Sequence, residues 1–453
     1  MTRGKSRSAG DRLPASEARD TIPPHASCER KLVGITLKNL RSILGPIDLQ
    51  SARIESGVYV EVGAFEAPSD DVMLDGEGKL AFPGFANCHT HLPMVLFRGL
   101  ADDVPLDAWL REYVWPIEAK LTPDDVYWCT LLALAESIRG GTTCVNDMYF
   151  HTDEVGRAVE ESGVRAVLSY GMIASTPEKE RAELDVARRL VKRWDGAAGG
   201  RIRAAVSPHT VYTCSEAAWR EGAEMARELG VPIHTHLAET ADEVASWRGK
   251  TDESPVAYLE RIGALDGPMI AAHCVHMDPE DISILAAHDV RVAHCPKSNA
   301  KLGSGVAPVP EMRAAGIPVG IGTDGAASNN RLDMVEELRA AWILQRGHCE
   351  DPTRLSGEVV VRMAVGDGRA ALGLPDAALE VGGAADVVLL NREASHSWPP
   401  HDPVSTLAYA ASADDVTDVI VDGRILMKDG ELLTIDEERV QSEVNRRLQR
   451  LRS

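Results

Sequence analysis

The 453-residue sequence lacks three features that mark common classes of protein. Its eight cysteines are scattered and form no C-x-x-C pair, which indicates reduced thiols and not a disulfide framework. No apolar run reaches the roughly 18 residues of a membrane span. Basic residues are scarce, because 48 Lys and Arg against 69 Asp and Glu give a formal net charge of −21. We therefore expect a cytoplasmic protein without a nucleic-acid or membrane partner.

The two ends of the chain differ in pattern from its centre. Residues 1–30 are rich in Ser, Pro, Ala and Arg and have no apolar core of a secretory signal, which predicts a flexible tail. Residues 31–80 are short and strand-like, and Val58–Val62 alternates. Strand patterns return after residue 374, with Asp422-Gly423 as a hairpin turn between 416–421 and 424–427. A last helical stripe follows, made of Val440, Val444, Leu448 and Leu451. We expect residues 31–80 and 375–453 to build one β-sandwich, with a terminal helix.

The centre of the chain, residues 81–374, alternates short apolar runs with helix-length segments. Near-continuous apolar strands between helices indicate a parallel sheet buried on both faces, and eight of them suggest a closed barrel. The fold class is therefore α/β, a (β/α)8 TIM barrel beside the sandwich. One helix should begin at Thr122-Pro123 and end at Gly140-Gly141, and Asn329 or Asn330 should cap another that runs to about Arg346. The runs are 80–91, 141–148, 165–172, 201–209, 231–239, 268–275, 290–296 and 317–324.

Histidines gather where these runs end, which is where active sites of such barrels form. Alternate residues of a strand point the same way, so His89 and His91 can chelate one ion from a single strand. His236 and Asp324 would approach from other strands. Three imidazoles and a carboxylate suit Zn²⁺, and Fe²⁺ is feasible. The alternative is that one of the two H-x-H pairs is structural, and His234 is the member better explained as a core or supporting histidine.

The segment Pro83-Gly84-Phe85-Ala86-Asn87-Cys88-His89-Thr90-His91 resembles the first-strand signature of the amidohydrolase superfamily. Segments 236–240, 272–276 and 322–330 are similar to the branch that contains 5′-methylthioadenosine/S-adenosylhomocysteine deaminases and triazine chlorohydrolases. The resemblance implies the barrel and sandwich, and one zinc ion on His89, His91, His236 and Asp324. Strand four ends at His209 without the lysine that bridges two metals in binuclear relatives, which supports a single ion. The resemblance also implies a homodimer or homotetramer.

Three residues carry the chemistry that the resemblance implies. Asp324 would hold the metal and accept a proton from the attacking water, and His273 would hydrogen-bond the resulting hydroxide. Glu239 would pass a proton to a purine ring nitrogen, although an acid at this place could also simply begin a helix.

Four further residues are candidate substrate contacts. Glu118 falls where relatives bind ribose hydroxyls, and a carboxylate can accept from both hydroxyls of a diol. Its alternative is an ordinary surface glutamate. His209 falls where relatives contact the base, and Ser328 would contact the base as well. Trp109 would line the pocket, and its alternative is a role in packing alone.

One departure bears on the substrate. Tyr170 stands where S-adenosylhomocysteine deaminases tend to have an arginine that binds the substrate carboxylate, and tyrosine cannot make that bidentate ion pair. We therefore expect a metal-dependent deaminase of an adenosine-type nucleoside. The tyrosine favours a substrate with a neutral 5′-group over one that carries homocysteine. The alternatives are a guanine- or pterin-type base deaminase or a triazine hydrolase of the same superfamily, and, more remotely, a non-catalytic barrel scaffold.

Overall fold

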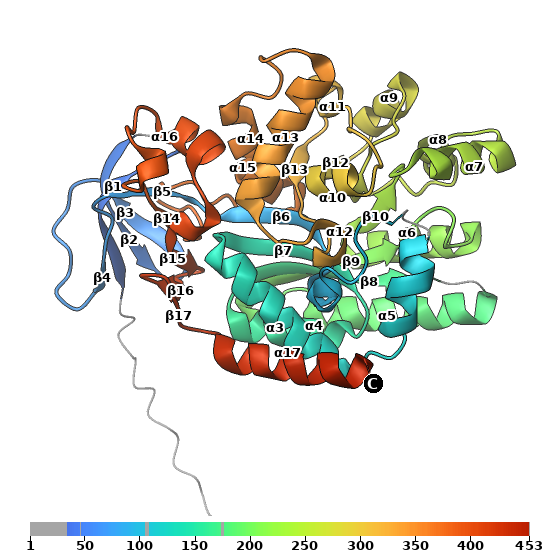
Figure 1. Ribbon diagram of the computed structural model, residues 1–453, viewed down its shortest axis with the longest axis horizontal. Coiled ribbons are helices and arrows are strands. Elements are labelled where there is room, and N and C mark those ends of the chain that lie inside the picture. Colours follow the sequence, from blue (N-terminus) through green and yellow to red (C-terminus); the bar gives the residue numbers. More distant parts are fainter. Residues whose placement is uncertain (1–33, 46, 105–107, 174–175, 453) are drawn as a thin grey trace, which may run out of the picture. The chain divides into compact units, whose positions relative to one another are not determined.

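The computed structural model describes residues 34–45, 47–104, 108–173 and 176–452, so the predicted tail lies outside the described residues. The described chain is α/β and consists of a barrel and a smaller β-sandwich (Figure 1). Both ends of the chain contribute strands to the sandwich, as predicted. The described cysteines are free, and no described helix is long and apolar enough to cross a membrane.

The barrel is a sheet of eight strands in chain order, and every described pairing within it is parallel. The predicted eight-stranded barrel is therefore confirmed. The first and last strands approach each other at their carboxyl ends, where the Asp324 amide, just beyond the last strand, donates to the His89 carbonyl at 2.9 Å. Gly322 permits this approach, because a Cβ there would lie 2.8 Å from the His89 nitrogen. The strands are β6 (Phe85–Thr90), β7 (Thr142–Tyr149), β8 (Arg165–Met172), β9 (Ile202–Pro208), β10 (Ile233–Leu237), β11 (Met269–His273), β12 (Val290–His294) and β13 (Val319–Ile321).

The first predicted run, 80–91, is in fact two strands. Its first half, β5 (Lys79–Pro83), pairs with β14 (Val387–Asn391) in the sandwich, and only β6 belongs to the barrel. Gly84 marks the division and packs so closely that an added Cβ would lie 2.0 Å from Thr143 Cγ2. Hydrophobicity alone did not reveal the division, because both halves are buried.

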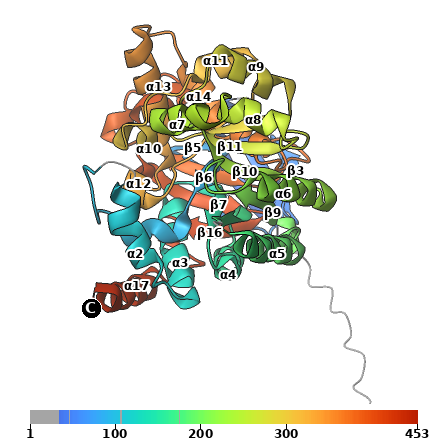
Figure 2. The same cartoon turned by 90° about the vertical axis from the view of Figure 1, so that its right-hand side faces the viewer.

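The helices surround the barrel strands (Figure 2). Thr122 caps α3 through a capping box with Asp125, which confirms the predicted start of that helix. The predicted cap at Asn329 or Asn330 is wrong: Asp333 caps the helix, because its carboxylate accepts from the amides of Val335 and Glu336. The helical elements of the barrel are η1 (Leu92–Phe97), η2 (Trp109–Val114), α2 (Trp115–Glu118), α3 (Pro123–Arg139), α4 (Thr152–Ser162), α5 (Pro177–Trp194), η3 (Ala198–Gly200), α6 (Glu216–Leu229), α7 (Ala241–Thr251), α8 (Pro255–Arg261), α9 (Pro279–Ala287), α10 (Pro296–Lys301), α11 (Val309–Ala314), α12 (Ala326–Asn329), α13 (Met334–Cys349), α14 (Gly357–Ala364) and α15 (Gly366–Ala371).

The sandwich consists of a four-stranded and a five-stranded sheet with a separate apolar core between them. The predicted hairpin turn at Asp422-Gly423 is confirmed. The first sheet has the order β3-β2-β1-β4, and the second β17-β16-β15-β14-β5. The remaining elements here are β1 (Ile35–Arg41), β2 (Asp48–Glu55), β3 (Val58–Val62), β4 (Val72–Asp75), β15 (Val416–Val421), β16 (Arg424–Lys428), β17 (Glu431–Leu432), η4 (Ser395–Ser397), α16 (Pro403–Ser405), η5 (Thr406–Ala410) and η6 (Ala413–Asp415).

Two sets of contacts join the ends of the chain to the barrel. The terminal helix α17 (Glu437–Arg452) lies beside α3, where Arg447 and Arg450 pair with Asp125 (Figure 1). Beneath the barrel, the carboxylate of Asp386 is fully buried and lies 2.6 Å from Arg165 and 2.8 Å from Arg369. A buried charge is tolerated only with such partners, so this cluster fixes the barrel on the sandwich.

Candidate metal centre and active site

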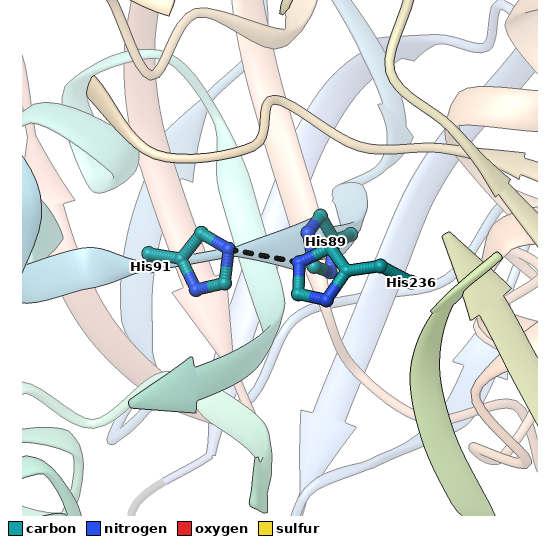
Figure 3. A group of neighbouring side chains, drawn as sticks. All are labelled: His89, His91 and His236. Atoms are coloured by element: carbon teal, nitrogen blue, oxygen red, sulfur yellow. Dashed lines mark hydrogen bonds between the residues drawn. The ribbon is translucent and has the colours of Figure 1, made fainter. Parts of the chain in front are cut away.

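Three histidines present the same ring nitrogen to one point at the carboxyl ends of β6 and β10. His91 Nδ1 lies 2.6 Å from the Met148 carbonyl, and His236 Nδ1 lies 3.1 Å from the His209 carbonyl. A carbonyl only accepts, so both rings carry their proton on Nδ1 and leave the lone pair of Nε2 free. His89 Nδ1 lies 2.9 Å from the ring of His234. The candidate ligand atoms of His89, His91 and His236 all lie within 4.8 Å of one another (Figure 3).

Asp324 completes this group from the end of β13. Its Oδ1 lies 3.6 Å from His89 Nε2 and 3.3 Å from His91 Nε2. Its Oδ2 accepts hydrogen bonds from Ser298 at 2.6 Å and Ser328 at 2.8 Å. Burial alone would raise the pKa of Asp324, but the surrounding histidines outweigh it and hold the pKa well below its usual value. The carboxylate is therefore charged. Its Oδ2 is held by the two serines, and its Oδ1 faces the imidazoles while accepting from the Gly325 amide at 2.7 Å.

This donor set fits a zinc ion. Two lone pairs, those of His91 Nε2 and His236 Nε2, face each other at 3.3 Å with no proton between them, as both protons are on Nδ1. Tetrahedral ligands with Zn–N bonds of 2.0–2.1 Å lie about 3.3 Å apart, so this spacing is that of two ligands on one ion. His89 Nε2 is also buried without a hydrogen-bond partner, which a cation at this point would satisfy.

Glu239 and His273 lie beside this group. Glu239 Oε2 is 3.9 Å from His273 Nε2, and His273 Nδ1 is 2.8 Å from Asn299 Oδ1. Burial raises the pKa of Glu239, and the nearby charge of His273 opposes that rise only in part. Burial would lower the pKa of His273, but Glu239, Asp324 and Asn299 raise it above its ordinary value. The pair can therefore hold a proton next to the metal position.

The backbone at the strand ends adopts conformations that L residues rarely use. Ala238, His273, Cys274 and Asp324 have φ values of 50°, 73°, 48° and 60°. Such residues cost of order 1–3 kcal/mol each and cluster at functional sites. Here His273 and Asp324 carry functional side chains, Ala238 directly precedes Glu239, and Cys274 directly follows His273.

One cavity brings the predicted site residues together. Glu118 is partly buried and accepts a hydrogen bond from Tyr149 at 2.7 Å, and burial raises its pKa. His209 lies against His236, with 4.4 Å between ring centroids, and Trp109 is buried in the π-helical turn η2. His89 is fully buried behind the cavity. The lining includes His91, Trp109, Glu118, His209, His236, Glu239, His273, Asp324 and Ser328.

Several contacts of these residues escape a reading of the sequence. The Ser328 hydroxyl donates to Asp324, a contact that the sequence did not predict, while Ser328 also lines the cavity, so its contact with the base stays a prediction. Ser298 and Asn299 were not predicted, although they follow β12 by one helical turn in Pro296-Lys297-Ser298-Asn299. A search that extended one turn past each strand would have found them.

The segment from residue 80 to residue 426 matches the model of the amidohydrolase family. The chain belongs to this family. It is 46% identical to a 5-methylthioadenosine/S-adenosylhomocysteine deaminase of Pelotomaculum thermopropionicum over 83% of this chain and 87% of that protein. It is also 46% identical to a 5′-deoxyadenosine deaminase of Methanothermobacter thermautotrophicus, over 87% of this chain and 93% of that protein.

A solved structure agrees with this membership. The crystal structure of an adenosine deaminase from Xanthomonas campestris with bound zinc superposes with a TM-score of 0.86, at 34% identity, over 93% of this amidohydrolase and 98% of that chain. The predicted family is thereby confirmed, and a similar protein holds zinc.

Proposed function

We propose that this amidohydrolase is a zinc-dependent deaminase that converts an adenosine-type nucleoside and water to the inosine analogue and ammonia. One observation supports this most: three of the four metal donors border a single cavity together with Glu239, His273 and Glu118. The fourth donor, His89, is buried behind that cavity, 3.6 Å from Asp324. The names of the relatives point to the same reaction, since they describe deaminases of 5′-methylthioadenosine, S-adenosylhomocysteine and 5′-deoxyadenosine. We also propose a homodimer or homotetramer, which light scattering tests.

His89, His91, His236 and Asp324 would hold the metal, which when bound makes water nucleophilic at neutral pH. Asp324 accepts a proton from the attacking water. Glu239, whose raised pKa favours the protonated carboxyl, gives a proton to the purine nitrogen beside the amine-bearing carbon. His273, fixed by Asn299, hydrogen-bonds the attacking oxygen through Nε2. A carbon–oxygen bond forms, and the carbon–nitrogen bond breaks as the amine takes the proton held by Asp324 and leaves as ammonia. The ring nitrogen keeps the proton from Glu239, and the proton of the new hydroxyl returns to Glu239 as the carbonyl forms.

We propose that Glu118 binds the ribose hydroxyls. Its Oε1 already accepts from Tyr149, which leaves Oε2 and a remaining lone pair of Oε1 for two hydroxyl donors. Glu118 also lines a second cavity that shares Trp115, Tyr149, Phe150 and Ile173 with the first. A nucleoside with its base at the metal and its ribose at Glu118 would extend its 5′-group toward this second cavity.

The described lining of the second cavity favours an uncharged 5′-group. It is largely apolar and includes Phe150 and Tyr170, whose ring centroids lie 5.9 Å apart. Lys179 is the one lysine or arginine among its described lining residues, and its ammonium lies 3.6 Å from the carboxylate of Glu183. A substrate carboxylate would have to compete with Glu183 for that cation. We therefore expect 5′-deoxyadenosine and 5′-methylthioadenosine to be better substrates than S-adenosylhomocysteine.

A substrate panel on the zinc-loaded enzyme tests these proposals. Ammonia release is measured from 5′-deoxyadenosine, 5′-methylthioadenosine, adenosine, S-adenosylhomocysteine, adenine, guanine and a triazine. We expect the highest kcat/KM with a nucleoside that has a neutral 5′-group. Higher kcat/KM on a free base or a triazine would refute the nucleoside assignment, and preference for S-adenosylhomocysteine would refute the argument from Lys179 and Glu183.

A further inference from the structure

A chain of hydrogen bonds runs from the candidate metal centre into the barrel interior. His234, two residues before His236 on β10, is fully buried behind His89. Its Nε2 lies 2.9 Å from His89 Nδ1, and its Nδ1 lies 3.3 Å from the Ser169 hydroxyl on β8. That hydroxyl donates to the backbone carbonyl of Asp147 on β7 at 3.1 Å. Four groups, from β6, β10, β8 and β7 in turn, thus follow one another.

The Asp147 carbonyl, at the inner end of this chain of hydrogen bonds, determines which atom of each pair is the donor. The Asp147 carbonyl can only accept, so Ser169 uses its single hydroxyl proton there. Ser169 must then accept from His234 Nδ1–H, which leaves a lone pair on His234 Nε2. That lone pair accepts from His89 Nδ1–H, and the lone pair of His89 is consequently on Nε2, where the metal donors converge.

His89 depends on a partner that determines its tautomer more than the other two ligands do. His91 and His236 donate from Nδ1 to backbone carbonyls, which cannot reverse the bond. The partner of His89 is an imidazole, which is able to donate or accept. If His234 donated from Nε2, the proton of His89 would move to its own Nε2 and block metal binding.

We propose that His234 and Ser169 are positioning residues that hold the proton of His89 on Nδ1 and so prepare Nε2 to bind the metal. This rests on the metal site of the proposed function, but not on the identity of the substrate. Groups that orient metal-bound histidines contribute about 10–100-fold to metal affinity. Ser169 contributes by excluding the wrong tautomer of His234, and His234 by accepting directly from His89.

Zinc affinity tests this proposal without a substrate. The dissociation constant for zinc is measured on purified full-length enzyme by competition with a chromophoric chelator. The proteins compared are the wild type, Ser169→Ala, His234→Phe and His234→Gln. We expect about tenfold weaker binding for Ser169→Ala and about 100-fold for His234→Phe. His234→Gln should recover part of this loss, because the amide oxygen can accept from His89 Nδ1 and the amide nitrogen can donate to Ser169.

Ser207→Ala is the matched control. Ser207 is also a buried serine on a neighbouring strand, and its hydroxyl donates to the backbone carbonyl of His234 at 2.6 Å, outside the proton chain. We expect its zinc affinity to stay within about twofold of the wild type, with thermal unfolding confirming that all variants fold. Equal zinc affinities for Ser169→Ala and Ser207→Ala would overturn the proposal. A wild-type enzyme that binds zinc but deaminates nothing would refute only the proposed function.

Discussion

Replacing Glu118 by glutamine separates recognition of the ribose from the chemistry at the metal. Hydrogen bonds to a charged group contribute about 1.5–3 kcal/mol each, and those between neutral groups about 0.5–1.5 kcal/mol. Tyr149 occupies one lone pair of Oε1, so glutamine would offer the two hydroxyls one neutral acceptor and an amide donor. Losing about 1.5–3 kcal/mol lowers kcat/KM for adenosine by a factor of about 10–100.

The assay pairs this variant with a substrate that lacks the hydroxyls. The wild type and Glu118→Gln are compared on adenosine and 2′,3′-dideoxyadenosine, and the two changes form a double-mutant cycle. We expect the variant to lose activity on adenosine but to differ little from the wild type on the dideoxynucleoside. An equal loss on both substrates would refute the reasoning, because Glu118 would then act on the fold or on the metal centre.

The pH dependence of the same pair adds an independent test. Burial raises the pKa of Glu118, while Tyr149 and His91 oppose the rise. As the pH falls through this raised pKa, the carboxyl takes up a proton and loses acceptor strength. The KM for adenosine should therefore rise toward acid pH, and the KM for 2′,3′-dideoxyadenosine should not follow it.

Three further predictions concern the proton donor, the metal and stability. Glu239→Gln should lower kcat by about 10²–10⁴-fold with zinc still bound, and the wild type should lose activity as the pH rises through the raised pKa of Glu239. In pH-rate measurements that alkaline loss should be absent from the variant. Zinc at a thousand times its dissociation constant should stabilise the fold by about 4 kcal/mol, and a denaturation series with and without chelator should show no such response in His91→Ala. Asp386→Asn should cost about 3–5 kcal/mol, because Arg165 and Arg369 stay buried without their partner. Asp422→Asn, at a partly exposed partner of Arg165, should cost under about 1 kcal/mol in the same urea titration.

Each of these has an outcome that contradicts it. Unchanged kcat in Glu239→Gln would remove Glu239 from the chemistry, and a chelator response retained by His91→Ala would place the ion elsewhere. Equal losses of unfolding free energy in Asp386→Asn and Asp422→Asn would mean that burial of the ion pairs does not determine their contribution to stability. The pKa of Asp386 is lowered in the fold, since the two arginines outweigh the effect of burial. Its contribution to stability is therefore present above the ordinary pKa of an aspartate and is lost as the pH falls through the lowered value.

The sequence predicted the barrel and pointed to the candidate metal centre because both depend on short-range patterns. A strand that ends in His-Thr-His places two imidazoles on one face whatever surrounds it. Where two explanations share one pattern, the prediction failed: the apolar run 80–91 did not show that Gly84 separates a sandwich strand from a barrel strand. The cap at Asp333 was missed because Asn329 and Asn330 are equally good capping residues.

The supporting contacts of the site could not be predicted from one sequence. Ser169 and His234 are 65 residues apart, and Asn299 is 26 residues from His273. Their contacts depend on the stagger between strands and on where a short helix begins. The local pattern of hydrophobic residues predicts neither of these. The pairing of Ser169 with Ala205 on β9, for instance, is known only from the assembled sheet.

Ammonia release from 5′-deoxyadenosine by the zinc-depleted and the zinc-reconstituted enzyme tests the central claim most directly. We predict that depletion abolishes the reaction and that reconstitution restores it, with one ammonia and one inosine analogue formed per nucleoside consumed. Zinc-reconstituted enzyme that releases no ammonia from this or any other adenosine-type nucleoside would contradict the account.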